Sequence, residues 1–134
     1  MIKFTIPLPP RELSPNASNR MPWIVKSKAK KAYREAVGWT ARLARGPGTN
    51  PLFSRCQIQY EIIIRREPGG YLPRDADNAT ASLKSAQDGM KDACLFSDDS
   101  HDRVRVLPPI FTKPGKNDKR SGIKVTVTAW ENEK

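Results

Sequence analysis

The chain has 134 residues, which fits one domain with a single modest core and is too short for two independent cores. Apolar residues make up 37% of it and charged residues 28%, a balance that excludes a mainly disordered chain, while 12 prolines predict long irregular connections. With 24 Lys and Arg against 14 Asp and Glu, the net charge of +10 favours a polyanionic partner, with nucleic acid ahead of anionic lipid.

The N-terminus and the two cysteines indicate the compartment. Met1 to Leu8 is short and alternating, unlike a signal peptide, and no stretch approaches the roughly 18 apolar residues of a membrane span. Cys56 and Cys94 lie far apart, without CxxC spacing or clustered His partners. We therefore expect a cytoplasmic protein with two reduced thiols, no zinc site, no disulfide and no membrane partner.

The first predicted element is a strand over Ile2 to Leu8, where apolar and polar residues alternate. Pro7 predicts that this strand lies at a sheet edge or ends early, because proline cannot donate to the ladder. The following segment, Pro9 to Pro22, has the Pro, Ser and Asn content of a structured loop.

A helix is predicted from about Ser27 to Arg45, where apolar residues recur at helical spacing. Ser27 is the expected N-cap, and Gly46-Pro47-Gly48 is the expected stop. Lysines crowd its first turns and oppose the helix dipole, which indicates a solvated or phosphate-facing surface.

The tryptophans and the single histidine are candidates for binding or catalysis. Trp39 and Trp130 fall in predicted regular elements and are expected in the core. Trp23, in a predicted loop beside basic residues, is the one tryptophan expected to be available to stack on DNA bases. His101 sits beside an acidic pair and could act as a base, but a polar strand-end role is the simpler interpretation.

Sequence patterns in the second half of the chain predict another strand and another helix. Cys56 to Arg66 becomes continuously apolar, as in a central strand buried on both faces. Asp77 to about Cys94 predicts a second helix, with an apolar stripe of Ala79, Leu83, Ala86 and Met90.

Two closing strands are predicted at Arg103 to Phe111 and Ile123 to Trp130, as an antiparallel pair joined by the basic turn KPGKNDKRSG. The predicted fold is therefore a single α/β domain over residues 1–134. It consists of a mixed sheet of about four to five strands with two main helices.

Carboxylates gather in one region of this basic chain. Half of the 14 acidic residues fall within positions 75–102, in DADN at 75–78, SDDSHD at 97–102 and two positions of the second helix. Clustered carboxylates repel one another unless a cation lies between them, and Mg²⁺ takes such oxygen ligands while keeping places for phosphate. A basic surface around an acidic metal pocket is typical of a metal-dependent phosphodiesterase.

Simpler interpretations exist for each acidic residue taken alone. Asp77 could only cap the second helix, and Lys84 with Asp88 could be an exposed ion pair. A calcium-binding EF-hand loop fits poorly, because Thr80 and Ala86 stand where it needs Gly and Glu.

The order of these segments resembles the RusA family of Holliday-junction resolvases over nearly the whole chain. The matching features are a first strand before LPPRELSPNASNR, a helix with AYREAV, DADN at 75–78, Lys84 with Asp88, and Asp98-Asp99 before a strand. The resemblance implies that Asp75, Asp77 and Asp99 bind Mg²⁺ and that Lys84 is the catalytic lysine.

One spacing departs from the family's pattern. The family has its lysine three residues after the Asn, whereas Lys84 comes six residues after Asn78. Three extra helical residues would rotate Lys84 by about 60° and move it about 4.5 Å along the axis, which keeps its face and changes its reach.

The resemblance implies an enzyme of phage or prophage type: a Mg²⁺-dependent crossover junction endodeoxyribonuclease acting in DNA recombination and repair. It would act in the bacterial cytoplasm as a homodimer making paired nicks in four-way junctions, with no small-molecule cofactor beyond the metal. Residues expected to contact DNA are Arg20, Lys26, Lys28, Lys30, Lys31, Arg74, Lys116, Lys119 and Arg120. Two alternatives stay open: a non-catalytic basic DNA-binding module with structural aspartates, and a nuclease of broader branched-DNA specificity.

Overall fold

The computed structural model describes residues 1–10, 13, 22–63, 83–97, 100, 102–112 and 122–130. Within these residues it contains five strands and two helices in one small domain, in agreement with the predicted α/β class. In chain order they are β1 (Ile2–Ile6), α2 (Trp23–Arg45), β2 (Cys56–Ile63), α4 (Lys84–Asp92), β3 (Val104–Val106), β4 (Ile110–Thr112) and β5 (Gly122–Ala129).

The sheet is mixed, as predicted. Its order is β1-β5-β2-β3, and β4 also pairs with β2 beyond β3. β1 and β2 both run antiparallel to β5, whereas β3 and β4 run parallel to β2. β1 is an edge strand and ends at Ile6, immediately before Pro7, so both expectations for that proline are confirmed.

The predicted strand over Arg103 to Phe111 is two strands, and the predicted hairpin is wrong. Pro108 and Pro109 have no N–H for the ladder, and the register against β2 slips by one residue between β3 and β4. β4 and β5 then lie on opposite sides of β2, so they are not neighbours. The basic segment between them, residues 113–121, lies outside the described residues.

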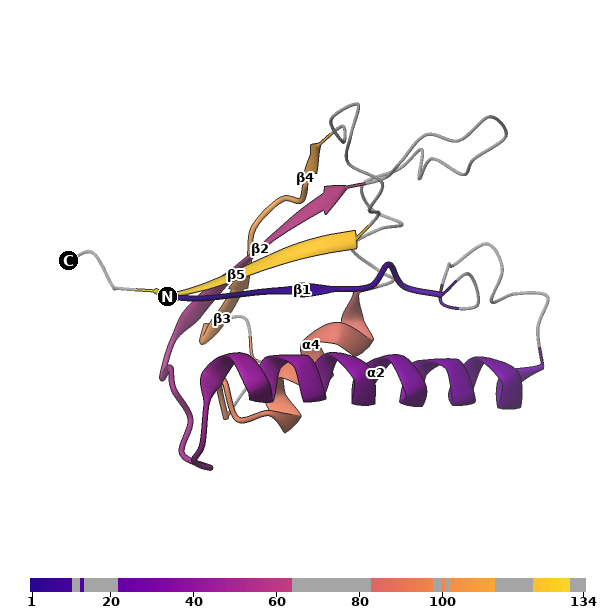
Figure 1. Cartoon of the computed structure of the whole chain (residues 1–134), viewed down its shortest axis with the longest axis horizontal. Coiled ribbons are helices and arrows are strands. Elements are labelled where there is room, and N and C mark those ends of the chain that lie inside the picture. The colour runs from indigo at the N-terminus through magenta and orange to yellow at the C-terminus, as the bar shows by residue number, and fades with distance from the viewer. Residues whose placement is uncertain are drawn as a thin grey trace.

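The core lies on one side of the sheet. Figure 1 shows both helices on the same side of the strands. Accordingly β2 alternates: Cys56, Ile58, Tyr60 and Ile62 are buried, whereas the residues between them are only half-buried. The expectation of a strand buried on both faces is therefore wrong, because the helices cover only one face; residues 64–66 of the predicted strand lie outside the described part.

Helix α2 begins at Trp23, four residues before the predicted start. Pro22 occupies the N-cap position, where its missing N–H costs nothing, and its carbonyl accepts from Val25 N at 3.1 Å. Ser27 is thus inside the helix and caps nothing. The predicted stop is confirmed, because the chain leaves the helix at Gly46 with a φ of 83°.

The side of α2 that faces the core is narrow. Tyr33, Val37 and Ala41 are its buried residues, at a spacing of four. Trp39 is 70% exposed and Leu43 82% exposed, so the expectation that Trp39 lies in the core is wrong. Their positions fall on the opposite side of the helix from the buried residues.

Helix α4 (Lys84–Asp92) confirms the second predicted helix over these residues, but the predicted bounds are too wide, because Leu83 is the N-cap and Ala93 the C-cap. Leu83, Ala86 and Met90 of the predicted apolar stripe are buried, while Ala79 lies outside the described residues. The helix ends at Asp92, and Cys94 adopts a positive φ of 62°. In the described part of the chain, neither helix has the length and apolar character that crossing a membrane requires.

Candidate functional site

The structure divides the predicted site residues into two groups. Lys84 and the four lysines of α2 fall within the described residues. Outside them fall the predicted metal ligands Asp75, Asp77 and Asp99, and the predicted DNA contacts Arg20, Arg74, Lys116, Lys119 and Arg120. The candidate site is therefore built from α4, from α2 and from the contacts between these helices.

Lys84 is the first residue of α4 and is exposed. Asp88 lies four residues on, one turn along the same side of the helix, and is half-buried. The first turn of α4 contains no acidic residue. A lysine at a helix N-terminus opposes the dipole, and the two positive charges together favour an anion such as a phosphate.

Two glycines bring α4 close to α2. A Cβ atom at Gly89 would lie 2.5 Å from the Arg34 carbonyl oxygen and 3.0 Å from the Gly38 nitrogen. A Cβ atom at Gly38 would lie 3.3 Å from the Gly89 carbonyl oxygen. The helix backbones therefore touch where they cross, and Gly89 in particular has no room for a side chain.

An ion pair joins the helices at the C-terminal end of α4. Arg34 donates from Nε to Asp92 Oδ2 at 2.6 Å and from Nη2 to Oδ1 at 2.8 Å, a bidentate geometry. The hydrogen bond from Arg34 lowers the pKa of Asp92 below its ordinary value of 3.8. The same hydrogen bond raises the pKa of Arg34, and the charge of Asp88 adds to this effect.

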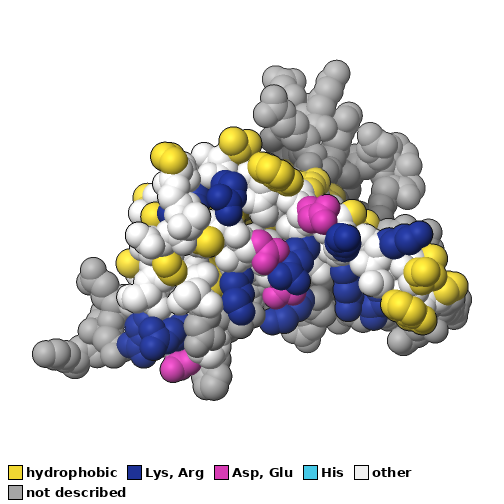
Figure 2. Space-filling view, turned by 90° about the horizontal axis from the view of Figure 1, so that it is seen from below, with side chains coloured by type: hydrophobic (Ala, Val, Ile, Leu, Met, Phe, Trp, Pro, Cys, Tyr) yellow, Lys and Arg dark blue, Asp and Glu magenta, His cyan; other side chains and the backbone are white. Residues whose placement is uncertain are grey.

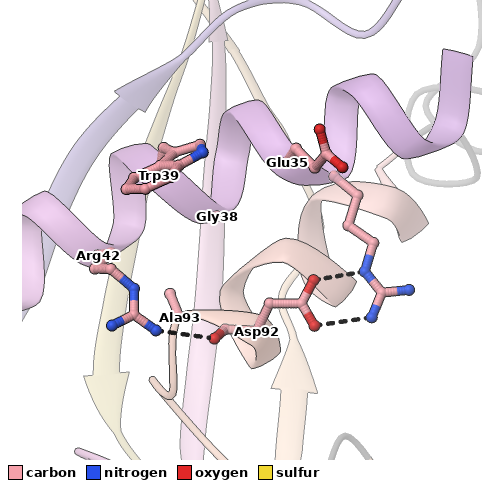
Figure 3. A pocket seen from close by; sticks show the side chains of 7 residues that line it. Glu35, Gly38, Trp39, Arg42, Asp92 and Ala93 are labelled. Carbon is pink, nitrogen blue, oxygen red and sulfur yellow. Dashed lines mark hydrogen bonds and ion pairs between the residues drawn. The ribbon is translucent and has the colours of Figure 1, made fainter. Parts of the chain in front are cut away.

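Two further arginines of α2 reach the carbonyl groups that end α4. Arg45 Nη1 donates to Cys94 O at 2.6 Å and to Ala93 O at 3.3 Å, and Arg42 Nη2 lies 3.5 Å from Asp92 O (Figure 3). Carbonyl groups at a helix C-terminus carry partial negative charge, so these contacts are favourable. Sequence reasoning missed this arginine cluster (Arg34, Arg42, Arg45), whose only signal was a basic last turn of α2.

The first ten residues of α2, Trp23 to Ala32, form a basic arm in which no side chain is buried. Lys28, Lys30 and Lys31 are exposed and Lys26 is half-buried. The arm has no acidic residue in its first turn and no side-chain cap. Figure 2, a view from the helix side, shows Lys and Arg side chains spread along this face of the molecule, with a few carboxylates near its middle.

A shallow groove of about 220 Å³ lies between the two helices. Trp39 and Arg42 border it from α2, and Asp92 and Ala93 border it from α4 (Figure 3). The carboxylate of Asp92 is already neutralised by Arg34, so the groove presents an exposed aromatic ring and a guanidinium.

Among the described residues, no three His, Cys, Asp or Glu side chains are grouped as metal ligands. The described geometry accordingly contributes a basic surface and one exposed lysine at the start of α4. The carboxylates expected to bind Mg²⁺ come from the segments outside it.

Comparison with known proteins does not place the chain in a family. No protein-family model matches the chain. A protein of Xylella fastidiosa, strain Temecula1, is 34% identical over 98 residues, which cover 73% of this chain and 61% of the relative. The chain thus spans less than two thirds of the length of that relative, which is described as an uncharacterized protein and brings no activity with its name.

Proposed function

We propose that this chain is a Mg²⁺-dependent endodeoxyribonuclease that resolves four-way DNA junctions by paired nicks, as a homodimer in the cytoplasm of a bacterial cell. The observation that carries the proposal is Lys84. It is exposed at the first residue of α4, while Arg34 and Arg45 hold the other end of that helix. The packed helix fixes the backbone position of Lys84, from which its charge could reach a phosphoryl transition state.

The three aspartates expected to bind metal carry the kind of ligand atom that a hard cation prefers. Asp75, Asp77 and Asp99 offer three carboxylates, and carboxylate oxygens are the ligands that Mg²⁺ prefers. Mg²⁺ bound there would supply Lewis-acid polarisation of the phosphate. Lys84 would hold a non-bridging phosphate oxygen, with the N–H groups of the first turn of α4 assisting it.

The basic arm supplies the affinity for DNA in this proposal. Its lysines contact phosphates and carry no sequence information, which suits an enzyme that recognises the shape of a branch. Trp23, 78% exposed at the start of the arm, is the aromatic residue placed to stack on an unpaired base. DNA phosphates would also relieve the repulsion between the arm's lysines and the positive end of the α2 dipole.

The basic arm also favours a second candidate function, a non-catalytic DNA-binding module. Affinity from the lysines of α2 requires none of the carboxylates. In that case the aspartates would be structural, and Lys84 would take no part in catalysis. The two candidates differ in whether the wild-type chain cleaves a junction that it binds.

The test is cleavage of a labelled synthetic four-way junction and a matched linear duplex, with Mg²⁺ or EDTA, using wild type, Lys84→Ala and Lys91→Ala. Lys91 is the matched control, an exposed lysine on the same helix. We expect paired nicks at the junction that EDTA abolishes. Cleavage should be slower by about 10²-fold or more in Lys84→Ala and unchanged in Lys91→Ala, with junction binding retained in both.

Other outcomes discriminate among the alternatives. Junction binding without cleavage, across several divalent metals, would favour the binding module. Equal cleavage of flaps and forks would favour a nuclease of broader specificity. Equal rates for the two lysine variants would remove Lys84 from the site, and loss of cleavage with retained binding in Asp75→Asn would speak against structural aspartates.

A further inference from the structure

The side of α2 that faces away from the core carries a second apolar row. Ala32, Ala36, Trp39 and Leu43 follow one another at spacings of four, three and four, and all four are exposed. Trp39 is 70% exposed and Leu43 82% exposed. This spacing is the repeat found where two helices pack against each other. A row of exposed apolar side chains that includes a tryptophan and a leucine is typical of an interaction surface.

Two opposite charges lie along one border of this outer row. Glu35 and Arg42 are both exposed and are seven residues apart, about 10.5 Å along the helix, too far to pair as helical neighbours do. Among the residues that the structure describes, no Lys or Arg nitrogen lies within 4 Å of the Glu35 carboxylate. Arg42 makes a long contact of 3.5 Å with a carbonyl oxygen, which leaves its guanidinium available.

A second α2 laid antiparallel on the first satisfies both features in one register. In that register Trp39 packs against the partner's Ala36, and Leu43 against the partner's Ala32, so each large side chain meets a small one. The same register sets Glu35 opposite the partner's Arg42, and the two-fold axis repeats the pair. A parallel arrangement would stack Trp39 on its own copy and would leave Glu35 and Arg42 without partners.

We propose that the outer row of α2 is a two-fold interface with a second copy of this chain, in this antiparallel register. The inference rests on the two-copy assembly of the proposed function and not on its nuclease chemistry. The contact is centred between Val37 and Gly38. Residues 23–29 of each basic arm extend past the level of the partner's Arg45, the last residue of its helix, whereas Ala32 at the end of the arm packs in the interface.

The interface also sets the spacing of the DNA-contacting lysines. Lys28 lies nine to ten residues from the centre of the contact, about 14 Å along the helix. The two Lys28 residues are therefore about 29 Å apart along the shared axis, one at each end of the assembly. Two separate basic arms related by a two-fold axis match a substrate that must be cut at two symmetric positions.

The experiment is mass measurement by light scattering and sedimentation over a range of concentrations. The variants are Trp39→Ala, Glu35→Arg, Arg42→Glu and the double Glu35→Arg/Arg42→Glu. Wild type should dimerise, and Trp39→Ala should weaken the dimer by about thirtyfold. Each single reversal should weaken it by about tenfold or more. The control Lys30→Glu, a charge reversal outside the outer row, should leave the mass unchanged.

Rescue makes the register itself testable. The double variant should dimerise again, and an equimolar mixture of the two single variants should form a heterodimer, because both restore opposite charges at both pairs. Circular dichroism of each variant excludes unfolding as the cause. Failure of both rescues, with folded proteins, would overturn the register.

Two results would overturn the interface altogether. One is a monomeric wild type at the highest concentration that it tolerates. The other is a Trp39→Ala variant that binds single-stranded DNA less tightly while its mass is unchanged, which would make the outer row a base-stacking surface. A wild-type dimer that cuts no junction would refute the nuclease activity but not the interface. A monomer that cuts junctions would refute the interface but not the nuclease activity.

Discussion

The two halves of α2 belong to one continuous helix, yet different forces hold them. From Tyr33 to Arg45 the helix contributes three buried side chains, a glycine that touches α4 and the arginine cluster. From Trp23 to Ala32 it has no buried side chain, no cap and four lysines at the positive end of its dipole. The C-terminal half is thus stabilised by packing, and the basic arm is a helix because it continues one.

The difference shows where the sequence serves stability and where it serves binding. Good helix formers such as Ala and Lys keep the arm helical, but its charges work against folding. Local features that conflict with stability, without compensation in the same chain, mark places where a ligand supplies the missing interaction. The predictions that follow change residues of the packed half, of its contacts or of the basic arm, and they measure stability and DNA binding.

The largest effect is expected from Gly89→Val in α4, at the contact with the packed half of α2. The new side chain would meet the backbone of α2 at the Arg34 carbonyl oxygen, so the helices must separate. We expect a loss of roughly 3 kcal/mol or more in the free energy of unfolding, measured by urea denaturation. The control Gly38→Ala, with its nearest contact at 3.3 Å, should cost less than about 1 kcal/mol. Equal stability of the two variants would refute the close approach at Gly89.

Replacing all four lysines of the arm with alanine should change binding and not stability. Junction affinity at moderate salt should fall by about 100-fold, and the slope of log K against log salt should shrink by about 0.9 for each phosphate that the arm no longer neutralises. The control is Lys3→Ala/Lys124→Ala, two exposed lysines on the sheet face away from the helices. An unchanged salt slope in the arm variant would show that DNA binds elsewhere.

The smallest effect is expected from Asp92→Asn, which weakens the ion pair between the end of α4 and Arg34 of the packed half. Because folding lowers the pKa of Asp92, its carboxylate stabilises the fold above pH 3.8, and this contribution is lost as pH falls through the folded-state value. Both partners are about half exposed, so we expect at most about 1 kcal/mol. The difference from wild type should be constant near neutral pH and should narrow below pH 4. Asp88→Asn is the control, and an equal loss there would argue against a specific role of the ion pair.

Sequence patterns predicted the local elements better than their arrangement. Alternation located β1 and β5, and helical spacing located α2 and α4, because these patterns reflect which side of each element is buried. The hairpin between β4 and β5 failed because adjacency in the chain was taken for adjacency in the sheet, whereas β2 lies between them. Trp39 was placed wrongly because hydrophobicity alone does not tell which of two apolar rows on a helix faces the core.

The candidate site divides in the same way. Lys84 and the lysines of α2 were predicted from the sequence, by resemblance and by charge, and they lie exposed or half-buried on helices. The contact of Gly38 with Gly89 and the arginine cluster could not be predicted, because they join residues about 50 positions apart through the crossing of two helices. Such contacts depend on tertiary geometry, which periodicity does not encode.

The place of β5 in the sheet has a consequence for how the chain is made. β5 is the last of the described strands, yet it lies between β1 and β2 and pairs with both along their length. During synthesis on the ribosome, the edges of β1 and β2 that pair with β5 stay unpaired until residues 122–129 have been made. Before that point the helices can pair through Gly38 and Gly89, and β2 can pair with β3 and β4, so synthesis should pass through a stage in which the helical pair exists and β1 is not yet joined to the sheet.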